Sequence, residues 1–334
     1  MDIFNLLQTL NNCHGPSGDE KAIADAICSM AAKYADEHWI DAMGNLIFHK
    51  RGEGAKLMLA AHMDSIGIIV THIEENGFLR FGKLGGVNIH GLIYSQVRFA
   101  NGTLGVVCAN ESADMRKLSV DDLYIDIGAA GKDEAEKAVK IGDAAVFNTA
   151  VFAAGDRIIS PYMDNRISCV VLLSVLQEIK KSQNDLYFVF TAQEEVGLRG
   201  AKTAAYAIEP DYAVAIDVTV SDDLPDAKHH GSSVLGKGAA IKVMDSSVIC
   251  HPQMVQLLTD LAKENQITYQ TDVIRAGGTD AGAIHLSRAG VYTGGISIPC
   301  RYIHTPAEMV QLSDVEACIK LTAAFVNAEL KAGE

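Results

Sequence analysis

The sequence has little of what marks a secreted disulfide protein or a nucleic-acid-binding protein. Its seven cysteines are an odd number, are spread widely along 334 residues and include no Cys-x-x-Cys pair. This usage favours reduced thiols in a cytosolic protein over a disulfide framework. Basic residues are also scarce, with 28 Lys and Arg against 42 Asp and Glu and a formal net charge of −14. A chain with this balance lacks the basic face that nucleic acid requires as a partner.

Long apolar runs are missing as well. No uninterrupted apolar stretch approaches the roughly 20 residues that span a bilayer, and no basic segment precedes an apolar one near Asp2. We therefore expect no signal peptide, no membrane partner and a cytoplasmic location. What remains is an ordinary globular composition, with 49% hydrophobic and 21% charged residues, and a length that predicts about two domains.

The pattern of expected elements indicates an α/β chain interrupted by a β-rich insert. Helices are expected at 3–10, 22–32, 163–181, 252–265 and 313–330, and strands at 39–40, 46–48, 56–61, 185–190, 212–216 and 291–298. Between 66 and 158 the expected strands are short and closely spaced, and two hairpin turn signals separate them. We predict one domain from 1–65 and 159–334, and a small β-rich domain inserted at 66–158.

Two adjacent carboxylates, Glu194 and Glu195, follow the apolar run 185–190, which has the pattern of a buried strand. Open α/β sheets bind ligands at the carboxyl ends of their strands. Acids placed there cost desolvation free energy unless a metal ion or a shared proton offsets it. Taken alone, the pair is better explained as a solvated strand-to-helix loop, so its interpretation depends on other segments.

Further candidate ligands lie at or just beyond the ends of other expected elements: His62, Asp64, Asp164, Asp217 and His304. Imidazoles and carboxylates are ligands of zinc, cobalt and manganese. No cysteine is spaced to join them, which weighs against a purely structural zinc site. Because there are more candidates than one tetrahedral ion requires, a two-metal centre is the most economical interpretation.

Six segments in this order resemble the M42 metallo-aminopeptidases, known as glutamyl, leucyl, deblocking or tetrahedral aminopeptidases. The segments are His62-Met-Asp64, Asp164-Asn-Arg166, Glu194-Glu-Val-Gly-Leu-Arg-Gly-Ala201, Asp217-Val-Thr219, Gly277-Gly-Thr-Asp-Ala281 and His304-Thr-Pro-Ala-Glu308. The resemblance spans nearly the whole chain. It implies an α/β exopeptidase domain with a dinuclear metal site, a mixed sheet and helices on both faces, plus an inserted PDZ-like or dimerisation domain.

Carried over residue by residue, the resemblance implies two divalent ions per subunit, zinc, cobalt or manganese. One would be held by His62, Asp164 and Asp217, and the second by Asp164, Glu195 and His304, so that Asp164 bridges them. Glu194 would be the general base, and Asp64 would orient His62. In related enzymes the bond after the bridging acid is often cis, so we expect a cis peptide at Asp164–Asn165. Asn165 and Ser65 stand where the family often has acids, and neither replaces a ligand.

The resulting hypothesis is an aminopeptidase that hydrolyses the first peptide bond of short peptides. Two metals sharing a water lower its pKa, and Glu194 would take its proton and pass it to the leaving amine. The resemblance also implies self-association into a tetrahedral dodecamer built from dimers. One alternative is a metal-dependent deacylase or carboxypeptidase acting on N-acyl amino acids, which needs no free amino group. A non-catalytic peptide-binding scaffold is another, but it would require a broken ligand set.

A few residues near these motifs admit two interpretations. Asp280 is expected to cap the helix that follows it rather than contact substrate. Arg301 fits a substrate carboxylate and a structural ion pair equally well. Arg275 is a candidate for recognising an acidic side chain of the substrate. The last helix is expected to begin at Ser313, with Glu316 completing a capping box.

Overall fold

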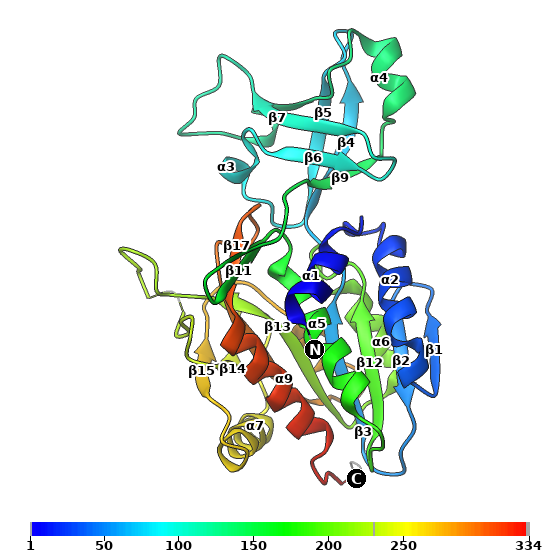
Figure 1. Ribbon diagram of the computed structural model, residues 1–334, viewed down its shortest axis with the longest axis vertical. Coiled ribbons are helices and arrows are strands. Elements are labelled where there is room, and N and C mark those ends of the chain that lie inside the picture. The colour runs from blue at the N-terminus through cyan, green and yellow to red at the C-terminus, as the bar shows by residue number, and fades with distance from the viewer. Residues whose placement is uncertain (1, 230, 332–334) are drawn as a thin grey trace.

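The computed structural model describes residues 2–229 and 231–331. These residues form two parts stacked along the long axis of the molecule, a large α/β part and a small β barrel above it (Figure 1). None of the described helices has the length and apolarity needed to cross a membrane.

A mixed sheet of eleven strands is the centre of the larger part. Its main path runs through β1 (Glu37–Ile40), β2 (Leu46–Lys50), β12 (Asp185–Thr191), β3 (Lys56–His62), β13 (Tyr212–Val220), β16 (Tyr292–Arg301), β17 (Glu308–Gln311), β11 (Arg157–Ser160) and β10 (Phe152–Ala154). β14 (Ala239–Met244) pairs with β16 and with β15 (Tyr269–Val273). The neighbours β12, β3, β13 and β16 are parallel, whereas β2 and β17 join them antiparallel. The predicted mixed α/β sheet is therefore confirmed.

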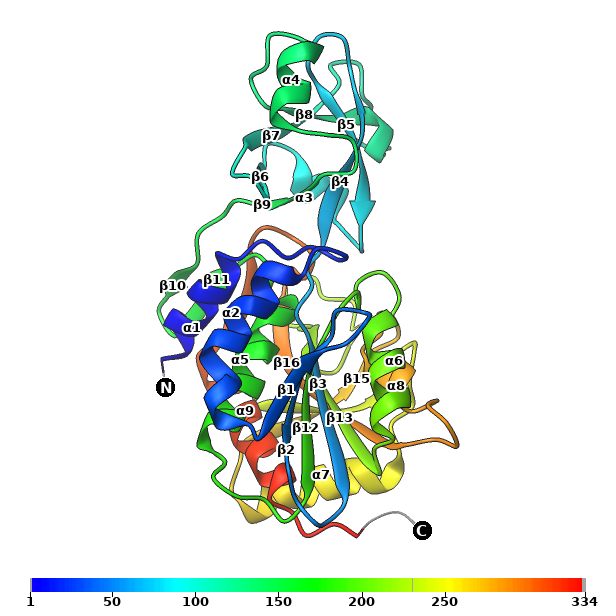
Figure 2. The same ribbon diagram turned by 90° about the vertical axis from the view of Figure 1, so that its right-hand side faces the viewer.

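Helices cover both faces of this sheet, as Figure 2 shows. One face packs against α1 (Ile3–Asn11), α2 (Lys21–Ala31), α5 (Met163–Glu178), α7 (Pro252–Glu264) and α9 (Leu312–Val326), and the other against α6 (Arg199–Ile208) and α8 (Ala281–Ile284). In β3, Leu57 and Leu59 face the first layer of helices while Met58 faces the second. Because successive side chains of a strand point to opposite faces, a strand covered on both sides is apolar throughout.

The smaller part is a closed barrel of six antiparallel strands with its own hydrophobic core. Around the barrel the strands are β4 (Gly67–Ile73), β5 (Leu79–Leu84), β8 (Leu123–Asp126), β7 (Leu104–Ala109), β6 (Gln96–Phe99) and β9 (Ala144–Phe147). The short helices α3 (Ile89–Leu92) and α4 (Lys132–Ala138) and the 3-10 turn η2 (Val120–Asp122) belong to the same stretch of chain, whereas the turn η1 (Ala32–Tyr34) follows α2. After β9 the chain returns to the large sheet at β10.

β13, β16 and α9 differ from the sequence-based expectation. β13 continues past Asp217 to Val220, because β16 stays paired with it beyond the last residue that pairs with β3, Ala215. β16 runs unbroken through Gly294, where a Cβ would lie 3.2 Å from the Leu258 side chain of α7, so this glycine serves close packing. α9 begins one residue early, at Leu312, and its N-terminus has no side-chain cap, so the expected capping box is wrong.

Candidate metal centre

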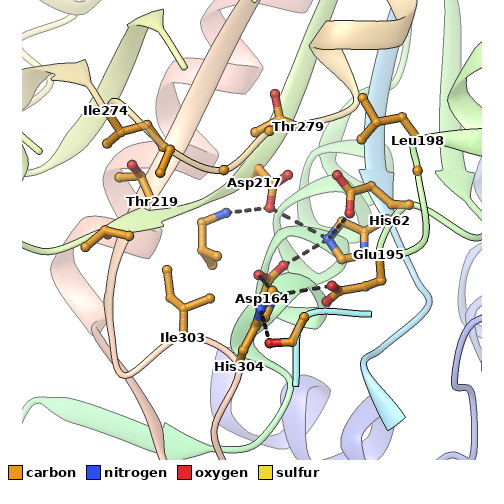
Figure 3. Close-up of a pocket in the computed structure, with 18 residues that line it drawn as sticks. His62, Asp164, Glu195, Leu198, Asp217, Thr219, Ile274, Thr279, Ile303 and His304 are labelled. Carbon is orange, nitrogen blue, oxygen red and sulfur yellow. Dashed lines mark hydrogen bonds and ion pairs between the residues drawn. The ribbon is translucent and has the colours of Figure 1, made fainter. Parts of the chain in front are cut away.

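Side chains from distant segments of the chain meet at the carboxyl ends of the parallel strands (Figure 3). The cavity they line has a volume of about 550 Å³. All five predicted metal ligands and the predicted general base lie in its wall: His62, Asp164, Glu194, Glu195, Asp217 and His304. The convergence expected from the sequence is therefore present in the fold.

The register of the strands explains why His62 lies beside Glu194 and Glu195. His62 is the last residue of β3 and pairs with Thr191, the last residue of β12, so the acids after Thr191 emerge beside it. Asp217 lies in β13, two residues beyond the end of its pairing with β3. β3 ends at His62 while β13 continues to Val220, and both His62 and Asp217 line the cavity at this edge of the sheet.

Asp164 lies between the two histidines. Its Oδ1 is 2.9 Å from Nε2 of His62, and its Oδ2 is 3.3 Å from Nε2 of His304. The residue occupies the first turn of α5, where Asp164 and Asn165 depart from helical φ and ψ and the bond between them is cis, as expected. One carboxylate thus presents a separate oxygen to each imidazole.

The remaining acids approach the histidines from other sides. Asp217 Oδ1 and Glu194 Oε2 each lie 3.8 Å from His62 Nε2, and Glu195 Oε2 lies 3.2 Å from His304 Nε2. Two groups of donors could each hold one ion, since the atoms of each lie within 4.8 Å of one another: His62, Asp164 and Glu195 in one, and His62, Glu194 and Asp217 in the other. These groups overlap the two predicted ligand sets without matching them one to one.

Burial of so many carboxylates perturbs their ionisation. Desolvation raises the pKa of Glu194 and of Asp217 well above the usual carboxyl range. Burial opposes protonation of His304, but hydrogen bonds with the Asp164 and Glu195 carboxylates outweigh it and raise the pKa of His304 to about 12. The buried carboxylates therefore stabilise a cation placed among them, here the protonated form of His304.

The donor chemistry of the cavity fits divalent cations. Among its described lining residues, none is Lys or Arg, and Oε1 of Glu195 is buried without a hydrogen-bond partner. Buried carboxylates are expected to be paired or to coordinate a metal. Imidazole and carboxylate donors without thiolate suit zinc, cobalt or manganese.

Asp64 supports the loop that carries the two glutamates. Its carboxylate, fully buried, accepts hydrogen bonds from the backbone N–H of Glu194 over 3.0 Å and of Glu195 over 3.3 Å. The Ser17 hydroxyl donates to the same carboxylate over 2.6 Å. Nδ1 of His62 lies 3.5 Å from Asp64 Oδ1 and 3.1 Å from its backbone carbonyl oxygen. Asp64 thus lies next to His62, as expected. It also holds the loop that carries Glu194 and Glu195, a role that the sequence did not indicate.

Two residues of the site were missed by sequence reasoning. The buried Glu308 accepts hydrogen bonds from the backbone N–H of His304 over 2.7 Å and of Asp164 over 2.8 Å. Its one signal in the sequence is its place in the same motif as His304. Gly86, which follows β5 of the barrel, has its carbonyl oxygen 3.1 Å from His304 Nδ1. A Cβ at Gly86 would lie 2.6 Å from that nitrogen, so this approach requires glycine.

Other expectations near the site are settled by local contacts. Asp280 occupies the N-cap position of α8, as expected, but its side chain makes no capping hydrogen bond; its buried carboxylate instead accepts a hydrogen bond from the Thr191 hydroxyl over 2.5 Å. Arg301 forms an ion pair with Asp223 at 2.7 Å, which favours the structural interpretation. The amide of Asn165 donates to the Ile216 carbonyl over 2.9 Å, a bond for which a carboxylate has no proton.

The chain is similar to known aminopeptidases along nearly its whole length. Residues 44–321 match the M42 glutamyl aminopeptidase family. The chain is 48% identical to a putative aminopeptidase of Acetivibrio thermocellus, covering 96% of this chain and 97% of that protein. It is 35% identical to the lysyl aminopeptidase of Pyrococcus furiosus, covering 98% and 97%. Its fold is similar to that of Pyrococcus horikoshii TET1 peptidase, which can assemble into a tetrahedron or a large octahedral shell, with a TM-score of 0.88, 32% identity and coverage of 97% and 99%.

Proposed function

Because the chain belongs to the M42 family of aminopeptidases, we propose that the cavity around Asp164 is its active site and uses two divalent metal ions to hydrolyse the first peptide bond of short peptides. One observation carries this proposal, the position of Asp164 between His62 and His304 with one carboxylate oxygen directed at each. In this arrangement Asp164 would offer one oxygen to each of two cations.

The proposed ligand sets are those that the family resemblance implies. His62, Asp164 and Asp217 would hold the first ion, and Asp164, Glu195 and His304 would hold the second. When bound, two such ions supply Lewis acidity and a water of lowered pKa. Zinc, cobalt and manganese are all compatible with this donor set.

The protein's own residues supply orientation and proton transfer. Glu194 accepts the proton of the attacking water and delivers it to the leaving amine. Its backbone N–H is held by Asp64 over 3.0 Å, while its Oε2 faces the cavity at 3.8 Å from His62 Nε2. The free α-amino group of a peptide is a cation, and the acidic wall around Asp217 offers it a favourable environment.

The proposal extends to domain organisation and assembly. Residues 1–65 and 159–334 form the catalytic domain, and residues 66–158 form an inserted, PDZ-like dimerisation domain. Dimers made through that insert assemble into a tetrahedral dodecamer. The closed barrel with a separate core supports an independent insert, and the tetrahedron of the Pyrococcus horikoshii peptidase supports the assembly. Sedimentation should show a particle of twelve chains, and a species of 35.7 kDa alone would contradict the assembly.

An assay of the purified chain tests the activity. After chelation, turnover of aminoacyl-p-nitroanilides should be lost, and zinc, cobalt or manganese should restore it. Glu194→Gln should reduce kcat by about 10²- to 10⁴-fold while two metal ions per chain remain bound. Glu53→Gln, an exposed glutamate outside the cavity, is the matched control and should retain full activity.

Two outcomes would overturn parts of this proposal. Peptides with an acetylated N-terminus should resist hydrolysis, so cleavage of N-acyl amino acids with no cleavage of free peptides would instead identify a deacylase or carboxypeptidase. Normal peptide hydrolysis by Glu194→Gln would remove Glu194 from its proton-transfer role.

A further inference from the structure

The side of the cavity away from the acids has an uncharged wall. Thr219, Ile274 and Ile303 lie across the cavity from His62 and Glu195 in Figure 3. Thr219 and Ile274 are buried, with 1% and 7% of their surface exposed, whereas Val220, which follows Thr219 in the lining, is 44% exposed. A wall of two isoleucines and one threonine offers apolar contact and no charge.

Asp272, the first acid behind this wall, already has hydrogen-bond partners at both carboxylate oxygens. Asp272 is fully buried, and its Oδ2 accepts a hydrogen bond from Nζ of Lys242 over 2.7 Å. Its Oδ1 accepts hydrogen bonds from the hydroxyls of Thr219 over 2.9 Å and of Ser233 over 3.2 Å. Both oxygens of Asp272 therefore have hydrogen-bond partners, and the Thr219 hydroxyl donates its only hydrogen to Asp272.

The second acid behind the wall, Asp245, also has partners for its carboxylate oxygens. Its Oδ1 accepts hydrogen bonds from the backbone N–H of Ser247 over 2.7 Å and of Val248 over 2.9 Å. Its Oδ2 lies 3.8 Å from Nζ of Lys242. Lys242 is itself 1% exposed and lies among these acids, so its ammonium group does not reach the cavity. Charges of both signs are thus present behind the wall but paired with one another.

We propose that this wall receives the side chain of the peptide's first residue and selects neutral aliphatic residues, such as leucine or methionine, over glutamate and lysine. The inference rests on the proposed function. The first peptide bond must lie at the proposed metal ligands, so the side chain of the first residue lies against the cavity wall that faces them, and Thr219, Ile274 and Ile303 form the uncharged part of that wall.

The reason for the selection is the cost of burying an unpaired charge. A glutamate side chain would lose water and find no Lys or Arg among the described lining residues. A lysine side chain would find the carboxylates behind the wall taken by Lys242 and by hydrogen bonds. Arg275, a sequence-based candidate for recognising an acidic residue, is exposed and is not among the residues that line the cavity. Of the activities named for the family and its relatives, the expected preference is that of a leucyl aminopeptidase and not of a glutamyl or lysyl one.

The first test is a substrate panel on the metal-loaded enzyme. We expect kcat/KM for leucyl-p-nitroanilide to exceed the values for the glutamyl and lysyl substrates by at least about 10²-fold. A charged substrate that equals or exceeds the leucyl one would overturn the selectivity while leaving the aminopeptidase function intact. Absence of turnover for every substrate would count against the proposed function. In that event, calorimetric binding of free leucine, glutamate and lysine still ranks the subsite, and tighter binding of either charged amino acid would overturn the inference.

The second test changes the wall. Ile274→Lys places a cation there and should raise the ratio of glutamyl to leucyl kcat/KM by at least about 10-fold. Ile303→Lys, at a less buried position, provides the same test if the first variant does not fold. Ile249→Lys is the matched control, because Ile249 is 73% exposed and lies outside this cavity. An unchanged ratio in a folded Ile274 or Ile303 variant would overturn the assignment of the wall to the first residue.

Discussion

The carboxylate of Asp64 accepts a hydrogen bond from the backbone N–H of Glu194 over 3.0 Å. It therefore connects the end of β3, which carries His62, to the loop after β12, which carries the proposed base. Ser17 donates to the same carboxylate over 2.6 Å and ties the segment before α2 to this junction. One buried acid thus sets the relative positions of a proposed ligand and the proposed base.

Replacement of Asp64 by asparagine should show how much catalysis depends on this junction. The amide keeps one acceptor oxygen and turns a donor toward a backbone N–H, so the glutamate loop should shift. We expect kcat or metal affinity to fall by about 10- to 100-fold. Kinetics with parallel metal analysis measure both quantities, and Asp121→Asn, an exposed site on the barrel, is the control. Wild-type kcat together with wild-type metal content would contradict the role given to Asp64.

Glu308 provides a second test, because its two oxygens accept hydrogen bonds from the backbone N–H groups of His304 and Asp164. Glu308→Gln leaves one of these buried donors facing an NH₂ group. The loss should lower the free energy of unfolding of the metal-free protein by about 1–3 kcal/mol, measured by urea denaturation in the presence of a chelator. Glu316→Gln, on the exposed side of α9, should leave the stability unchanged, and equal stability of the two variants would exclude a structural role for Glu308.

The convergence of the site could be predicted from the sequence because it follows from strand ends. His62 and the acids after Thr191 each come directly after an apolar run, and parallel neighbours deliver such residues to one edge of a sheet. The in-register pairing of His62 with Thr191 realises that expectation. The same logic applies to the core, since strands covered on both faces, such as β3, are recognisable as continuous apolar runs.

The contacts that support the site could not be predicted, because their partners are remote in sequence. Asp280 has the sequence context of a helix cap, and only the fold brings it to the Thr191 hydroxyl, 89 positions away. The structural role of Arg301 likewise depends on its ion pair with Asp223, 78 positions away. β17, which carries Glu308, has four residues, too few for a strand period to be recognised, and its place is set by pairing with β16 and β11.

The cysteines should divide into two classes toward an alkylating reagent. Burial raises the pKa of Cys169 and of Cys250 to about 12, and the reactive species is the thiolate. Iodoacetamide at pH 8 should leave the four buried cysteines of the native protein unmodified: Cys169, Cys250, Cys300 and Cys318. Mass spectrometry counts the modified sites, and the same treatment in urea should label all seven. Rapid labelling of Cys169 without denaturant would contradict its position behind His62, whose carbonyl oxygen accepts its Sγ–H at 3.2 Å.

The ion pair between Asp223 and Arg301 predicts a specific pH dependence of stability. Nε and Nη2 of Arg301 donate to the two carboxylate oxygens over 2.8 and 2.7 Å, and these hydrogen bonds lower the pKa of Asp223 to about 2. The unfolded value is about 3.9. Because the folded pKa is the lower one, the stabilisation is fully present above the unfolded pKa and is lost as the pH falls through about 2.

Wild-type protein and Asp223→Asn should therefore differ most near neutral pH. We expect a difference of about 1–2 kcal/mol in the free energy of unfolding at pH 7, shrinking once the pH falls below about 4. Urea denaturation at pH 7, 5, 4 and 3 measures this trend. Arg301→Gln should remove the same pH-dependent contribution, and the double variant should lose little more than either single one, because the two side chains stabilise the fold through one shared contact. A difference between wild type and Asp223→Asn that stays constant from pH 7 to pH 3 would show that the carboxylate's charge is not what stabilises this pair.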